Sequence, residues 1–158
     1  MTDDAKILIV DDEVGILKML EITLQKEHFT YITTAKTKAE ALQAVAEKNF
    51  DIILLDVMLP DGDGFALCSA IRQQTVAPIL FISARSSDFD KLTGLSVGGD
   101  DYITKPFNPL EVVARIRAIL RRQREYEKKA IQTEMKNYVY NTFTFLPDEA
   151  LLTVEGKV

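Results

Sequence analysis

Side chains that could handle a phosphate group follow four separate apolar runs of this sequence. Asp11 and Asp12 follow the run KILIV, and Asp56 follows IILL. Ser83 follows PILFI, and Lys105 follows DYIT. Three carboxylates at close range repel one another unless a cation lies between them, and a site made only of oxygen ligands suits Mg²⁺, with Mn²⁺ as an alternative.

The same groups supply the parts of a phosphoryl-transfer site. Asp56 is the expected nucleophile, whose carboxylate would become an aspartyl phosphate. Lys105, together with a metal ion, would offset charge on the phosphoryl oxygens, and the Ser83 hydroxyl can donate a hydrogen bond to one of them. Taken singly, Asp12 and Ser83 could be helix caps and Lys105 a surface lysine. Their arrangement as a set favours the phosphate site.

The elements that must position these groups alternate between strand and helix. The expected strands are 6–10, 29–34, 51–55, 78–82 and 101–104, each followed by a helical pattern. Their continuous apolar runs are typical of a parallel sheet that is covered on both faces. We therefore predict an α/β fold with a doubly wound, flavodoxin-like sheet of order 2-1-3-4-5 and helices on both faces. In this fold ligands bind at the carboxyl ends of the strands.

Composition sets the class of protein. The chain has 158 residues, of which 47% are hydrophobic and 27% charged, enough for one core and a short appendage. A net charge of −5 argues against nucleic-acid binding by the chain as a whole. Cys68 is the single cysteine and is expected in the core, and no apolar run is long enough to span a membrane. These features predict a cytoplasmic protein without membrane contact.

The composition changes after residue 121. The charged run RRQREYEKKA either continues the last helix or becomes a linker, and residues 125–136 are assigned to that linker. Residues 137–145 (NYVYNTFTF) and 150–154 (ALLTV) read as two strands. Two strands cannot bury a core by themselves, so a short β fragment of a second domain is expected over 137–158.

Four motifs together resemble a known family. VDDE at 10–13, DVMLPDGDG at 56–64, ISA at 82–84 and DDYITKPF at 100–107 resemble the receiver domain of two-component response regulators, over residues 5 to about 124. DDYITKPF with the NPLE and ARIRAILRR that follow is similar to the OmpR/PhoB subfamily of transcription regulators. The resemblance implies phosphorylation of Asp56 by a sensor histidine kinase and no turnover of external substrates. It also implies that 137–158 opens a winged-helix DNA-binding domain, largely absent here, through which alone the full-length protein would bind DNA.

The resemblance also assigns roles at the site. It implies an oxygen-ligand Mg²⁺ site made of Asp12, Asp56 and the Met58 carbonyl directly and Asp11 through water. Ser83 becomes the switch hydroxyl, and Lys105 pairs with the phosphate and precedes a cis peptide bond to Pro106. Tyr102 becomes the switch aromatic, although its spacing alone equally suits an aromatic that fills a strand edge. Met58 and Arg85 match variable positions that tune the phosphate lifetime.

A dimer surface is implied on the fourth helix, fifth strand and fifth helix. Its residues are Lys91, Leu92, Leu95, Asp100, Asp101, Glu111, Ala114, Arg115 and Arg122. The expected pairs between subunits are Lys91–Glu111, Asp101–Arg115 and Asp100–Arg122, in a symmetric homodimer that forms on phosphorylation. Alone, such charges would usually be a solvated face. The lone His28 is expected at the surface rather than as a phosphate donor.

Two other functions compete with the receiver interpretation. A phosphatase of the haloacid-dehalogenase type uses a similar set of groups but needs a second acid two residues after its nucleophile, where this chain has Met58. A flavodoxin-like FMN carrier needs a loop rich in hydroxyl groups and glycine after the first strand, where the acidic DDE would repel the cofactor phosphate.

Overall fold

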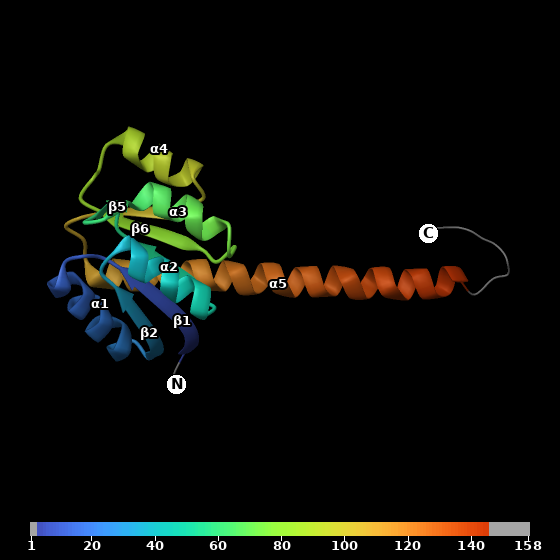
Figure 1. Cartoon of the computed structure of the whole chain (residues 1–158). Helices are drawn as coiled ribbons and strands as arrows, with labels where there is room; N and C mark the ends of the chain where they lie inside the picture. Colours follow the sequence, from blue (N-terminus) through green and yellow to red (C-terminus); the bar gives the residue numbers. More distant parts are fainter. Residues whose placement is uncertain (1–2, 146–158) are drawn as a thin grey trace. The chain divides into compact units, whose positions relative to one another are not determined.

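The computed structural model describes residues 3–145, and the side chains of residues 3–136. Strands and helices alternate along the chain, with a two-stranded hairpin (β4 and β5) inserted after the third strand (Figure 1). The elements are β1 (Asp3–Val10), α1 (Val14–Lys26), β2 (Phe29–Ala35), α2 (Lys38–Glu47), β3 (Ile52–Leu55), β4 (Met58–Leu59), β5 (Gly62–Asp63), α3 (Gly64–Arg72), β6 (Ile79–Ser83), α4 (Asp88–Ser96), β7 (Asp101–Thr104) and α5 (Pro109–Phe145).

The main sheet has the predicted order. Its five parallel strands run β2-β1-β3-β6-β7, which is 2-1-3-4-5 when the five strands are counted along the chain. Val10 of β1 pairs with Leu55 of β3, so both strands end at the same level. The prediction of a doubly wound, flavodoxin-like sheet is therefore confirmed.

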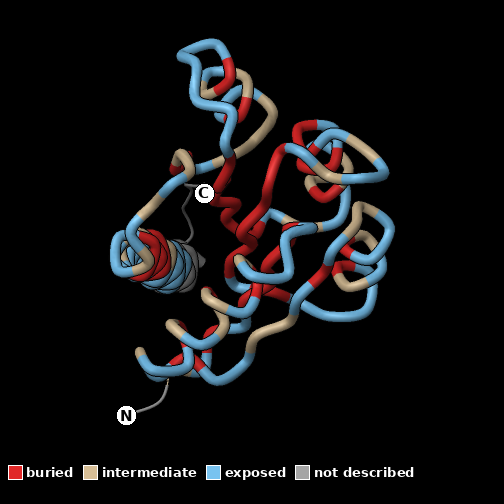
Figure 2. Tube along the Cα trace, turned by 90° about the vertical axis from the view of Figure 1, so that its left-hand side faces the viewer, coloured by how far each residue is buried: buried red, intermediate tan, exposed pale blue. Residues whose placement is uncertain are grey.

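The central strands are buried because helices cover both faces of the sheet. All four residues of β3 and all five of β6 are buried. The helices α2 and α3 lie on one face, and α1 and the start of α5 lie on the other (Figures 1 and 2). Figure 2 shows that the buried backbone is concentrated in the central strands. A sheet packed this way is a rigid base for groups that follow its strand ends.

Cys68 and His28 lie where the sequence predicts. Cys68 is fully buried on α3 and belongs to the main core cluster. His28 is exposed in the turn between α1 and β2, where it has a φ of 76°. A left-handed residue at this position ends α1 and lets the chain turn back into β2.

The C-terminal part of the chain differs from the prediction. Contacts divide the chain into two units, Met1–Ile119 and Leu120–Val158. The helix α5 continues through 125–136, which agrees with the alternative that the charged run extends the last helix, and also through 137–145, where a strand was expected. The strand prediction for 137–145 is wrong because a helix, once formed by the preceding Arg, Glu, Lys and Ala residues, extends at little cost, whereas a strand needs a partner.

The predicted strand 150–154 lies outside the described residues. Among residues that the structure describes, no helix is both long and apolar enough to cross a bilayer.

Candidate functional site

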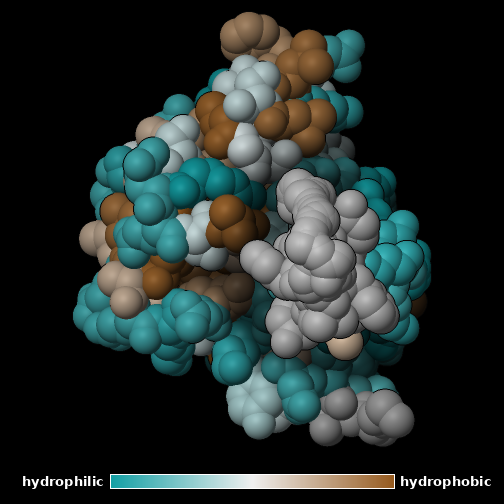
Figure 3. Space-filling view, turned by 90° about the vertical axis from the view of Figure 1, so that its right-hand side faces the viewer, coloured by the Kyte–Doolittle hydropathy of each residue, from teal (hydrophilic) through white to brown (hydrophobic). Residues whose placement is uncertain are grey.

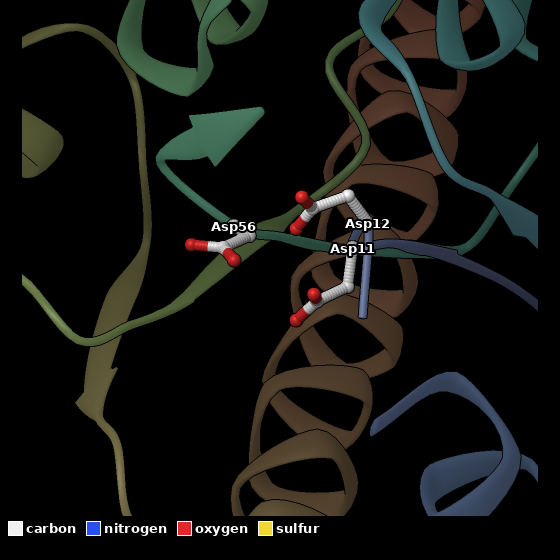
Figure 4. A group of neighbouring side chains, drawn as sticks. All are labelled: Asp11, Asp12 and Asp56. Carbon is white, nitrogen blue, oxygen red and sulfur yellow. The ribbon is translucent and has the colours of Figure 1, made fainter. Parts of the chain in front are cut away.

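The ends of β1 and β3 bring three carboxylates together. The Asp56 N–H donates to the Val10 carbonyl at 3.0 Å, so the hydrogen bonding between β1 and β3 extends one residue beyond β3, to Asp56. Asp11, Asp12 and Asp56 each offer an oxygen within 4.8 Å of the others, and Figure 4 shows the three carboxylates turned to the same side of the strand ends. Asp11 and Asp56 are buried, whereas Asp12 is exposed. The convergence predicted from the sheet order is confirmed.

Lys105 reaches this acidic group from the end of β7. Its Nζ lies 2.9 Å from Asp11 Oδ2, 2.9 Å from Glu13 Oε1 and 3.0 Å from Asp56 Oδ2. The lysine side chain is only 13% exposed. The predicted cis peptide bond between Lys105 and Pro106 is present. One ammonium group therefore holds carboxylates from two strand ends.

The pKa values of the site reflect its burial and its pairing. Burial raises the pKa of the Asp11 carboxyl, and this outweighs the lowering by hydrogen bonds from Lys105 and the Glu13 N–H. Burial alone would lower the pKa of Lys105, but hydrogen bonds to Asp11, Glu13 and Asp56 outweigh it and raise that pKa. The lysine is therefore fully charged at neutral pH, and the carboxylates hold more negative charge than it neutralises.

The loop after Asp56 is fixed at several points. The Met58 N–H donates to Asp56 Oδ1 at 3.2 Å. The Gly64 N–H at the start of α3 donates to the Val57 carbonyl at 2.7 Å. Asp61, at the turn of the hairpin, accepts hydrogen bonds from the first backbone N–H groups of α2, chiefly that of Lys38, and these lower its pKa. The hairpin is thus tied to two helices, and Asp56 lies at its base.

Ser83, at the end of β6, and Tyr102, within β7, lie beside each other. Ser83 is fully buried, and its hydroxyl accepts a hydrogen bond from the Arg85 N–H at 3.2 Å. Tyr102 is 9% exposed, and its hydroxyl donates to the Arg85 carbonyl. Burial raises the pKa of the Tyr102 phenol, against a lowering by the neighbouring Ser83 hydroxyl. The aromatic side chain therefore points inward, against the Phe81 ring at 5.8 Å.

The donor set fits a hard divalent cation. All its members offer carboxylate oxygens, two of the three acids are buried, and the excess negative charge described above favours a cation. Mg²⁺ and Mn²⁺ prefer such oxygen ligands. Asp11, Asp12 and Asp56 could hold the ion, and the role of the Met58 carbonyl stays a prediction.

The residues assigned to a dimer surface lie on α4, β7 and α5, except Asp100, which directly precedes β7, and several have partners within the chain. Leu92 and Leu95 of α4 are 63% and 49% exposed. Arg115 forms ion pairs with Asp101 at 2.8 Å and with Glu111 at 3.1 Å. Of the remaining members, Lys91 is half-buried, Ala114 and Arg122 are exposed, and Asp100 pairs with Arg72 at 3.2 Å.

Three residues near the site were not assigned a role from the sequence. Glu13 shares Lys105 with the buried acids. Asp61 caps α2, and Asp90 forms a capping box with Ser87 at the start of α4. The capping box was visible as an acid three residues after a serine, before a helical pattern. The partners of Glu13 and Asp61 lie 92 and 23 residues away in the chain, and no local pattern connects them.

Comparisons with known proteins agree on one family. The family model described as the response regulator receiver domain matches residues 7–117. The transcriptional regulatory protein YvrH of Bacillus subtilis (strain 168) is 48% identical over 155 residues, which cover 98% of this chain and 64% of the relative. The chain thus spans less than two thirds of that relative's length.

Solved structures give the same result. A two-component response regulator from Clostridium difficile superimposes with a TM-score of 0.74 at 36% identity, over 76% of this chain and 98% of that one. DrrB, an OmpR/PhoB homologue from Thermotoga maritima, superimposes with a TM-score of 0.69 at 35% identity. That match covers 77% of this chain and 54% of DrrB.

Proposed function

The chain belongs to the response-regulator receiver family, and from that premise we propose that Asp56 accepts a phosphoryl group from the phosphohistidine of a sensor kinase. The observation that carries the proposal is the buried Asp56 carboxylate at the end of β3, 3.0 Å from Lys105 Nζ and grouped with two further acids. The family assignment replaces the phosphatase and FMN-carrier interpretations.

In the proposed reaction an Asp56 carboxylate oxygen bonds to phosphorus while the bond from phosphorus to the imidazole nitrogen breaks. The imidazole leaves and takes up a proton, and Asp56 becomes a mixed anhydride. Lys105 Nζ pairs with a phosphoryl oxygen, and the Ser83 hydroxyl turns to donate to another. A divalent cation, held by Asp12, Asp56 and the Met58 carbonyl with Asp11 through water, would supply further positive charge against the phosphoryl oxygens.

The phosphoryl group acts here as a signal, since receiver domains are signalling proteins rather than enzymes that turn over external substrates. A phosphate adds nearly two negative charges to a buried strand end. Ser83 and Tyr102 would report that change, because the Ser83 hydroxyl lies beside the phenol and both contact Arg85. We place this signalling in the cytoplasm.

The metal requirement can be tested directly. Phosphoramidate with Mg²⁺ should add one phosphoryl group to the chain, detected by intact mass. EDTA in place of Mg²⁺ should reduce the rate at which the adduct forms about 10²-fold, because the unneutralised acids repel the donor. Added Mn²⁺ should restore the rate. Equal rates with Mg²⁺ and with EDTA would contradict the assigned role of the acidic group.

Phosphorylation would control transcription through a dimer. The proposed dimer uses α4, β7 and the start of α5, where Leu92 and Leu95 expose apolar side chains beside the charges of Asp101 and Arg115. Figure 3 shows apolar surface at the top of the molecule, and α4 lies at the same end in Figure 1. Contact with DNA would come from a winged-helix domain after the receiver, as the transcriptional regulators among the relatives suggest.

The dimer proposal predicts a change of mass in solution. Phosphorylated wild type should sediment as a dimer, and Leu92→Glu should remain a monomer while it still carries the phosphate, because a charge would be buried in the apolar contact. Val76→Glu is the matched control, since Val76 is 84% exposed and lies in the loop between α3 and β6. A fully phosphorylated wild type that stays monomeric, or a Leu92→Glu variant that dimerises like the control, would refute this interface.

A further inference from the structure

One residue of the loop between β6 and α4 holds both side chains of the proposed switch. The Arg85 N–H donates to Ser83 Oγ at 3.2 Å, and the Arg85 carbonyl accepts from the Tyr102 hydroxyl. The positions of Ser83 and Tyr102 therefore both depend on where the backbone of Arg85 lies.

The Arg85 side chain is in turn fixed by Asp90. Its Nε and Nη2 lie 3.0 and 2.7 Å from Asp90 Oδ1, and its Cζ lies 5.4 Å from the centre of the Phe65 ring. The second oxygen of Asp90 accepts from the Ser87 hydroxyl at 2.7 Å and from the Ser87 N–H at 3.3 Å. The Asp90 side chain is 12% exposed. The Asp90 carboxylate is therefore held by Ser87 on one oxygen and paired on the other with Arg85, whose side chain is 42% exposed.

The helix that carries Asp90 also contacts the switch aromatic. A Cβ placed on Gly94 of α4 would lie 3.1 Å from ring atoms of both Phe81 and Tyr102. The close approach of α4 to these rings leaves little room for a larger residue at this position, and it packs α4 against Phe81 and Tyr102. A change in the position of the Arg85 backbone should therefore displace the Tyr102 side chain, whose hydroxyl is bonded to it.

We propose that Asp90 is a positioning residue for the switch: by pairing with Arg85 it holds Ser83 and Tyr102 in the inward arrangement before any phosphate arrives. The value of such positioning rests on the proposed phosphorylation of Asp56. The position of Tyr102 itself can be tested in the unphosphorylated protein. In the proposed switch Tyr102 lies inward when Ser83 has moved towards the phosphate on Asp56. A pair that raises the population of the inward arrangement would therefore favour phosphorylation. The surface residues of α4 would then be linked to the phosphate site through Asp90.

The test reports on Tyr102 in the unphosphorylated protein. The chain is labelled with 3-fluorotyrosine, and Tyr102→Phe assigns the ¹⁹F resonance of this one tyrosine among five. In wild type the Tyr102 resonance should differ clearly from that of the urea-unfolded chain. In Asp90→Asn and in Arg85→Met it should move toward the unfolded value, and Arg85→Lys, which keeps the charge, should retain part of the wild-type shift.

A matched control separates positioning from helix capping. Ser87→Ala removes the side-chain cap of α4 and one hydrogen bond to Asp90 Oδ2, but it leaves both contacts of Arg85 with Asp90 Oδ1. It should therefore lower the melting temperature and move the Tyr102 resonance much less than Asp90→Asn does. Arg85→Met leaves the capping box intact and should move it. Both Asp90→Asn and Arg85→Met should also slow the reaction with phosphoramidate at least about fivefold.

The outcomes separate the two proposals. If Asp90→Asn and Arg85→Met keep the wild-type resonance, or Ser87→Ala moves it as far as they do, the positioning role is overturned. If the resonances respond as expected but the wild type takes no phosphoryl group, the proposed function fails while the positioning of Tyr102 by Asp90 stands. If both variants move the resonance but react at the wild-type rate, the claim that the pair favours phosphorylation is overturned.

Discussion

Lys105→Met is expected to lower the free energy of unfolding by about 3 kcal/mol at pH 7 in buffer without divalent cations. The ammonium group contacts three carboxylates at 2.9–3.0 Å, and its loss leaves Asp11 and Asp56 buried without a cation. Added Mg²⁺ should recover part of the loss in Lys105→Met, because it would replace the missing positive charge. Urea unfolding followed by circular dichroism, with and without Mg²⁺, measures both effects.

The pH dependence of this variant follows from the pKa shifts. The pKa of Lys105 is raised in the folded state, so its contribution is fully present below the pKa of an unfolded lysine and is lost only in strong alkali. On the acid side the pKa of Asp11 is raised by burial, so Asp11 takes up a proton at a higher pH than an unfolded aspartate. The difference between variant and wild type should therefore be constant around neutral pH and in mild alkali, and it should shrink as the pH falls through the raised pKa of Asp11.

Lys18→Met is the control for Lys105→Met. Lys18 is exposed on α1, and its replacement should change the free energy of unfolding by less than about 0.5 kcal/mol. A Lys105→Met variant as stable as Lys18→Met would show that Lys105 does not offset the charge of the buried acids.

Gly64→Ala is expected to destabilise the fold by about 3 kcal/mol and to slow phosphorylation as well. A Cβ at this position would lie 2.6 Å from the Val57 Cα and would clash with the Asp56 carbonyl. Both are backbone atoms, so the clash can be relieved only by moving the loop that carries Asp56. Thermal unfolding and the rate of the phosphoramidate reaction would report the two effects.

Gly15→Ala provides the matched control. Gly15 lies in the first turn of α1, where a Cβ meets no atom within 4 Å among the described residues. Alanine is the better helix former, so this variant should gain up to about 1 kcal/mol and react at the wild-type rate. Opposite effects of the same substitution would identify the close approach at Gly64 as the cause. Equal stability of the two variants would refute it.

Much of the site could be predicted because it follows from backbone topology. Parallel strands that end at the same level place the residues after them together, so Asp11 and Asp56 converge once the order 2-1-3-4-5 is known. The carboxylate cluster and the reach of Lys105 to it needed no side-chain detail beyond charge and length. The inward position of Tyr102 agrees equally with a filled strand edge and with a switch aromatic.

The parts that the sequence did not reveal depend on particular side-chain pairs or on the extension of a helix. The hydrogen bond from Lys105 to Glu13 depends on the conformations of two side chains that lie 92 residues apart in the sequence. Asp100 was assigned to a dimer pair, yet it accepts from the Ile79 N–H and from Arg72 within the chain. The strand expected at 137–145 is part of α5, since β-branched and aromatic residues describe a tendency that the adjoining helix overrides.

The phosphoacceptor assignment has one direct measurement. Wild type, Asp56→Asn and Asp51→Asn are incubated with phosphoramidate and Mg²⁺, and their intact masses are compared. Asp51 lies at the opposite end of β3, where it accepts a hydrogen bond from the Lys6 N–H, so it controls for the loss of an aspartate near the same strand. One phosphoryl group on the wild type and on Asp51→Asn, and none on Asp56→Asn, is the expected result. No adduct on the wild type, or an equal adduct on Asp56→Asn, would contradict it.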